Sequence, residues 1–164
     1  MRRLILLGGP PGVGKSTLLE LLTARLPKSA ALDADDVWRV SDDMASDATR
    51  RFAISNVTSV MRGYFEGGCE LGILAWVFAR AELYQPVLDS LSGVVDHSLL
   101  IHVVASPETL ERRLVARGDP EKLPYARTRL ELIRQLPFPR IDTSDLSPTT
   151  AADRVAAAIL EWGA

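Results

Sequence analysis

The chain alternates between short, continuous apolar runs and longer segments in which apolar residues recur every three or four positions. Continuous apolar runs are typical of strands buried on both faces, and the three-to-four spacing is typical of helices with one buried face. The predicted strands cover residues 3–8, 30–32, 71–78, 99–105 and 140–143. The predicted helices cover residues 14–26, 42–65, 80–91, 106–117, 125–136 and 148–162.

Residues at the ends of these segments support the assignment. Ser106-Pro107-Glu108 combines an N-cap residue, a proline at the first helical position and an early acid, and Ser147-Pro148 repeats the first two. Gly67-Gly68 ends the helix that begins at residue 42, whereas Pro86 is a candidate interruption of its helix. Strands that alternate with helices predict an α/β fold with a parallel sheet covered on both faces, and ligands in such folds bind at the carboxyl ends of the strands.

Composition and charge narrow the class of protein. A chain of 164 residues, 47% hydrophobic and 24% charged, suits one globular domain spanning 1–164. The net charge of −2 supplies no bulk positive field, so we expect no nucleic-acid track and no membrane partner. Cys69 is the single cysteine, which excludes an intrachain disulfide. The apolar run 4–7 is too short for a signal peptide or a spanning helix, so we expect a cytoplasmic protein.

The most specific motif lies between the first predicted strand and the first predicted helix. It matches the complete phosphate-binding P-loop pattern, in which glycines let successive N–H groups and a helix N-terminus point at one anion. Lys15 is expected to bridge the β and γ phosphates of ATP, Ser16 to offer its hydroxyl to Mg²⁺, and Thr17 to lie near the α phosphate. The residues expected around the nucleotide are Gly9, Pro10, Pro11, Gly12, Val13, Gly14, Lys15, Ser16 and Thr17.

Acidic residues directly follow the second predicted strand. Asp33 and Asp35 alternate along the chain there, so both could face the γ phosphate and the acceptor of a transfer reaction. The strand predicted over 71–78 carries no acid at its end, which leaves Asp33 as the candidate for Mg²⁺ and Asp35 as the candidate for orienting a hydroxyl. A second interpretation is that Asp33, Asp35 and Asp36 only cap a following helix.

With these motifs, the chain resembles small P-loop kinases of the shikimate and gluconate kinase type, and also chloramphenicol phosphotransferase-like proteins. The resemblance implies a three-layer α/β/α P-loop NTPase fold whose five parallel strands have the order 2-3-1-4-5. It implies that the residue matching Asp33 lies in the water shell of Mg²⁺ and that the residue matching Asp35 contacts the acceptor hydroxyl. The expected activity is transfer of the γ phosphate of ATP to a hydroxyl of a small molecule.

The same resemblance implies a short lid over the phosphates at about 117–124, and Gly118 and Pro120 would flank its mobile loop. Arg113 would stack on adenine, Arg117 would contact phosphate during transfer, and Pro148 would cover the other face of adenine. Guanidinium groups suit both tasks, since they stack on flat rings and bind oxygens in pairs.

The acceptor side is less well defined by the sequence. Helices within about 36–66 are expected to bind the acceptor, but after the third strand the chain carries Ala75-Trp-Val-Phe-Ala-Arg80 in place of the shikimate or gluconate kinase motifs. Trp76, Phe78 and Arg80 suggest an apolar wall with one anion contact, although aromatic residues at strand ends more often belong to the core. By resemblance, Arg129 would bind a carboxylate of the acceptor.

Two other functions fit parts of the sequence. A polynucleotide or nucleoside 5′-hydroxyl kinase is suggested by the acid-and-arginine pattern of residues 35–39, in which Arg39 would contact the acceptor. A nucleotide-dependent regulatory NTPase would also bind ATP at the P-loop. The chain shows none of the switch elements that such regulators commonly use.

Overall fold

A computed structural model of the chain describes residues 1–38 and 46–163. Its five strands form one sheet in the order β2-β3-β1-β4-β5, and every neighbouring pair is parallel, which confirms the predicted fold and strand order. The strands are β1 (Arg3–Gly8), β2 (Ser29–Asp33), β3 (Leu71–Ala75), β4 (His97–Val104) and β5 (Arg140–Asp142).

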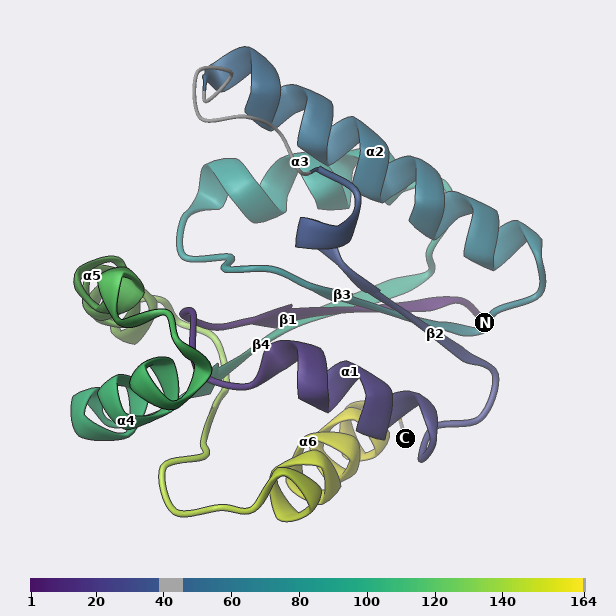
Figure 1. Cartoon of the computed structure of the whole chain (residues 1–164). Coiled ribbons are helices and arrows are strands. Elements are labelled where there is room, and N and C mark those ends of the chain that lie inside the picture. Colours follow the sequence, from purple (N-terminus) through teal and green to yellow (C-terminus); the bar gives the residue numbers. More distant parts are fainter. Residues whose placement is uncertain (39–45, 164) are drawn as a thin grey trace.

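Helices cover both faces of this sheet. Figure 1 shows α1 and α6 on one face and α2 and α3 on the other, which gives the three-layer arrangement. Within the described residues, no helix is both long enough and apolar enough to span a membrane. The helices are α1 (Lys15–Thr23), α2 (Asp47–Glu66), α3 (Ala81–Leu91), α4 (Pro107–Arg117), α5 (Leu123–Arg134) and α6 (Pro148–Trp162), with the short 3₁₀ turns η1 (Ala34–Asp36) and η3 (Pro120–Lys122).

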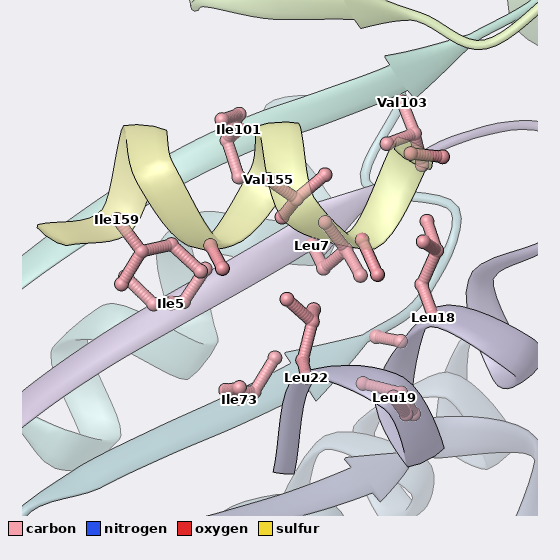
Figure 2. Packing of buried hydrophobic residues seen from close by; sticks show 14 of the residues in the cluster. Ile5, Leu7, Leu18, Leu19, Leu22, Ile73, Ile101, Val103, Val155 and Ile159 are labelled. Atoms are coloured by element: carbon pink, nitrogen blue, oxygen red, sulfur yellow. The ribbon is translucent and has the colours of Figure 1, made fainter. Parts of the chain in front are cut away.

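The central strand β1 sends alternate side chains into two cores. Leu4 and Leu6 pack with α2 and α3, whereas Ile5 and Leu7 pack with α1 and α6, and all four are fully buried. Figure 2 shows the second core, where Ile5 and Leu7 lie between helices α1 and α6. Burial on both faces explains why this strand is a continuous apolar run, because every position is removed from water.

The ends of several predicted strands and helices differ from those in the structure. The strand predicted over 71–78 ends at Ala75, because the chain turns out of the sheet and Phe78 adopts a positive φ of 40°. Helix α3 continues through Pro86 without interruption, and the segment 117–124, expected to form a lid, contains η3 and the start of α5. The start predicted at residue 42 lies outside the described residues, and α2 is described from Asp47, where the Ser46 side chain caps it.

The register of the sheet brings the predicted site residues to one edge. Leu7 of β1 pairs with Ala75 of β3, and Ala75 in turn pairs with Asp33 of β2. Since all the strands are parallel, the loops after β1, β2 and β3 leave the sheet at the same edge. The P-loop and the acids after β2 therefore meet there, although β3 lies between their strands.

Candidate active site

The P-loop joins β1 to α1 and is shaped by glycine conformations. Gly14 directly precedes α1 and has a φ of 99°, in the left-handed region that side chains rarely adopt. A Cβ at this position would meet no atom within 4 Å, so the requirement for glycine is conformational rather than steric. This turn leaves the first N–H groups of α1 available to an anion.

Lys15 folds back over the loop. Its Nζ donates hydrogen bonds to the carbonyl oxygens of Gly9, at 2.9 Å, and Pro10, at 3.2 Å. Burial lowers the pKa of Lys15 to about 8, while the charges of Asp33 and Asp35 oppose that shift and Arg117 adds to it. The ammonium thus lies among charged groups of both signs, where a bound phosphate would stabilise its charge.

Asp33 connects the P-loop to the end of β2. The Ser16 hydroxyl donates a hydrogen bond of 2.7 Å to Asp33 Oδ2, and the other carboxylate oxygen accepts one of 3.2 Å from the Asp35 N–H. Asp33 therefore does cap η1, as the second interpretation of the sequence expected, and it also reaches the P-loop serine.

The environment of Asp35 makes its carboxylate more basic. Loss of water around the group raises its pKa, the neighbouring charge of Asp33 raises it further, and Lys15 lowers it. A hydrogen bond from the Trp38 side chain also favours the charged carboxylate. A carboxylate with a raised pKa is a better acceptor for the proton of an attacking hydroxyl.

The side chains around Ser16 fit a magnesium ion. Mg²⁺ prefers oxygen ligands, keeps several waters and is usually held by one or two protein groups together with substrate phosphates. The Ser16 hydroxyl and Asp33 carboxylate offer two adjacent oxygens of that kind. In the described part of the chain there is no cluster of three or more His, Cys, Asp or Glu side chains suited to a metal.

A cavity of about 700 Å³ lies beside the P-loop, between α1, α4 and the loop before α6. It is large enough for a nucleotide base and sugar. Thr17, Arg113, Arg117 and Pro148 line it together, as the sequence-based interpretation required of residues around adenine and phosphate. Residues 143–148, which follow β5 and reach the start of α6, also line the cavity.

Arg113 forms hydrogen bonds to two loops that line this cavity. Its Nη1 donates hydrogen bonds to Val13 O, at 3.3 Å, and Thr143 Oγ1, at 3.2 Å, and its Nη2 donates one of 2.7 Å to Thr143 O. The guanidinium thereby links the P-loop to the loop after β5. Sequence reasoning predicted only its stacking on adenine, because hydrogen bonds to distant carbonyl oxygens leave no local pattern in a sequence.

A second cavity, of about 480 Å³, lies over the P-loop and brings together Lys15, Ser16, Asp33, Asp35 and Arg117. Arg117 also lines the first cavity and thus stands between the two. Its side chain now forms an ion pair with Asp119, within the predicted lid.

A third cavity, of about 560 Å³, shares lining residues with the second. It contains Arg80 and Arg129 from the predicted acceptor site, together with Trp76. Arg39 lies outside the described residues. Trp38 and Tyr125 line both the second and the third cavity, and sequence reasoning did not assign either to the site. The position of Trp38 three residues after Asp35 was the available signal for it, whereas nothing local marked Tyr125.

Comparison with known families decides the assignment. A family model described as an AAA domain, AAA_18, matches residues 5–134 and thus most of the chain. The chain belongs to this AAA domain family. The match includes the P-loop, the acids after β2, the helices α2 to α4 and the whole of α5.

The fold of this AAA domain protein is similar to the folds of small kinases in solved structures. It is similar to a tunicamycin resistance protein from Deinococcus radiodurans, with 19% identity, a TM-score of 0.69 and coverage of 97% of this chain and 96% of the other. A shikimate kinase from Acinetobacter baumannii in complex with shikimate has 17% identity, a TM-score of 0.67 and coverage of 98% and 94%. A gluconokinase from Sinorhizobium meliloti has 14% identity, a TM-score of 0.66 and full coverage of both chains. These likenesses show the fold and confirm the predicted resemblance to small P-loop kinases.

Proposed function

We propose that this AAA domain protein is an ATP-dependent kinase that transfers the γ phosphate to a hydroxyl group of a small molecule. The observation that carries the proposal is the position of Asp35, which lines the same cavity as Lys15, Ser16 and Arg117. That cavity shares residues with the nucleotide-side cavity and with the third cavity. A donor and an acceptor bound on the two sides would therefore meet beside the Asp35 carboxylate.

The nucleotide would bind with its base in the 700 Å³ cavity, between Arg113 and Pro148, and its phosphates on the P-loop. Thr17 lines this cavity near the start of α1, in keeping with a contact to the α phosphate. On binding, the Lys15 ammonium would exchange its contacts with the Gly9 and Pro10 carbonyls for the β and γ phosphates.

Transfer would proceed by in-line displacement. The acceptor oxygen attacks the γ phosphorus, the bond between that phosphorus and the β–γ bridging oxygen breaks, and ADP leaves with the bonding electrons. Asp35 orients the acceptor hydroxyl and accepts its proton, which then passes to solvent. Arg117 would leave Asp119 and, with Lys15, stabilise the charge that spreads over the phosphoryl oxygens.

Mg²⁺ would be held by Ser16 and, through its water shell, by Asp33. Bound there, the ion supplies charge neutralisation for the phosphate oxygens. Asp33 also keeps the Ser16 hydroxyl in place through their hydrogen bond, so the two residues form one preorganised oxygen pair.

The acceptor would occupy the third cavity, in contact with Asp35, Arg80 and Arg129. We place the functional parts within a single domain, 1–164: an acceptor-binding region at about 36–66 and a lid at about 117–124. Arg39 belongs to the acceptor-binding region of this proposal as a further contact.

The proposal is tested by ADP release from ATP and Mg²⁺ over a panel of metabolites, nucleosides and aminocyclitols. At least one hydroxyl compound should stimulate release and carry the phosphate afterwards. Asp35→Asn should lower transfer by about 100-fold or more and leave the ATP dissociation constant nearly unchanged. Asp89→Asn, which changes an exposed carboxylate on α3, is the matched control. Tight ATP binding with no phosphorylated product from any compound would contradict the kinase function.

A further inference from the structure

The third cavity has features that phosphate transfer alone does not require. Its volume of about 560 Å³ falls within the range typical of small-molecule sites. It shares four lining residues with the second cavity, which are Trp38, Trp76, Val77 and Tyr125. A ligand in the third cavity can therefore extend a hydroxyl toward Asp35, which lines the second.

Aromatic side chains form its walls at the junction. The ring centroids of Trp38 and Trp76 lie 6.1 Å apart with the planes at 65°, so the two indoles meet at a corner. Phe78 packs edge-on against Trp76, again at 6.1 Å, and Trp76 itself is only 8% exposed, which holds this wall in place. A flat ring placed in such a corner can stack on one indole and meet the other edge to face.

Two arginines of the cavity have no acidic partner among the described residues. Arg50 pairs with Asp47 at 2.9 Å, but neither Arg80 nor Arg129 forms an ion pair in the described part of the chain, although Glu82 also lines the cavity. The Arg129 guanidinium lies 4.4 Å over the Tyr125 ring, and its buried Nε has no hydrogen-bond partner within that part. A buried donor of this kind costs free energy unless a ligand satisfies it.

Uncharged hydrogen-bonding side chains are scarce in the described lining. Apart from the aromatic residues, only Ser46 is both polar and uncharged there, and its hydroxyl already contacts Thr49. An apolar ring with one anionic group would satisfy both the aromatic walls and the two arginines that lack an acidic partner among the described residues.

We propose that the acceptor is an anionic alcohol built on a flat aromatic or heteroaromatic ring, with the ring against Trp38 and Trp76 and the anionic group on Arg80 and Arg129. The inference rests on the proposed function, because it assigns the ligand of the same site. The negative charge follows the anion contacts that the sequence suggested for Arg80 and Arg129, and the corner between Trp38 and Trp76 adds the requirement for a flat ring.

Calorimetric titration in the presence of ADP and Mg²⁺ separates these requirements without turnover. The probes are para-hydroxymethylbenzoate, its neutral carboxamide, and the cyclohexane analogues of both compounds. The flat anion should bind at millimolar concentration, and removal of either the charge or the aromatic ring should weaken binding by about tenfold. Equal affinity for all four compounds, or no detectable binding of the flat anion, would overturn the inference.

Variants of Arg80 and Arg129 test whether these two residues bind the anionic group. Arg80→Gln and Arg129→Gln should each weaken the flat anion by about tenfold and leave its neutral carboxamide unaffected. Arg154→Gln, an exposed arginine on α6, should change neither affinity. If the arginine variants bind the anion as tightly as the unaltered protein, the assignment of the anion site is wrong. Binding of the anion without any phosphorylated product from ATP would instead count against the kinase function and leave the ligand chemistry supported.

Discussion

The Ser16 hydroxyl and the Asp33 carboxylate are hydrogen-bonded at 2.7 Å, although 17 positions separate them along the chain. Ser16 is the second residue of α1 and Asp33 is the last residue of β2, so the bond joins the start of α1 to the end of β2, although β3 lies between β1 and β2 in the sheet. Residues 76–79 after β3 include no acid, and this hydrogen bond brings the Asp33 carboxylate to the P-loop serine.

Replacement of Asp33 by Asn should weaken the use of magnesium. The amide keeps an oxygen near Ser16 but removes the negative charge, so we expect a loss of about 10- to 100-fold in metal affinity or activity. The dependence of ADP release on Mg²⁺ concentration measures this effect. The exposed Asp89→Asn variant serves as the control, and an unchanged magnesium dependence in Asp33→Asn would show that Asp33 only caps η1.

ATP affinity should fall as the pH rises above about 8, where free Lys15 loses its proton. The phosphates require the charged ammonium, so the association constant should fall by up to about tenfold per pH unit above that value. Titration calorimetry across this range checks the slope. Lys15→Arg should remove the dependence, because guanidinium stays charged throughout.

The lowered pKa of Lys15 also predicts how the free energy of unfolding changes with pH. In the unfolded chain Lys15 keeps its proton up to its ordinary pKa of 10.5, but in the folded chain the proton is lost near 8. Between these values the unfolded state binds more protons, so the contribution of Lys15 to the free energy of unfolding should increase with pH. Urea unfolding of the unaltered protein and of Lys15→Met, compared at both ends of this window, isolates the contribution.

Gly8→Ala should destabilise the fold by about 1–3 kcal/mol through overpacking. A Cβ at Gly8 would lie 2.3 Å from Cδ2 of His102, a fully buried ring whose Nε2 lies 3.0 Å from the Phe78 carbonyl oxygen. Urea unfolding measures the loss. Gly63→Ala on the exposed side of α2 is the control, since a Cβ there meets nothing within 4 Å and should not destabilise the helix.

A double variant tests the cause of that loss. If the clash with His102 is responsible, Gly8→Ala should cost less in a His102→Ala background than in the unaltered protein. Strictly additive changes in the free energy of unfolding would show that the two positions do not interact and would contradict the steric explanation.

The Arg113→Gln variant separates two roles of this residue, which are linking the P-loop to the loop after β5 and stacking on adenine. Loss of the hydrogen bonds to Val13 and Thr143 should lower the free energy of unfolding by about 1–3 kcal/mol. If Arg113 also stacks on adenine, ATP affinity should fall more than affinity for inorganic triphosphate, as calorimetry can measure. Equal losses for both ligands would remove the stacking role. Arg154→Gln again provides an exposed control.

Much of the fold could be predicted because its signals are local. The apolar run of β1, the glycine turn before Lys15 and the Ser-Pro starts of α4 and α6 each act through neighbouring residues. The end of β3 was predicted less well, since Trp76 to Ala79 are as apolar as the strand before them. These residues are buried after the chain has left the sheet, so hydrophobicity alone could not mark the turn.

The sequence by itself determined the P-loop, the alternation of strands and helices and the acids that follow β2, because each depends on residues close together in the chain. Only the tertiary structure decided that Ser16 bonds to Asp33, that Arg113 joins two loops and that Trp38 and Tyr125 face one cavity. Those relationships depend on strand order and on crossovers that bring distant segments to one edge of the sheet. No local pattern encodes such distances, so the P-loop could be predicted from the sequence and the lining of the third cavity could not.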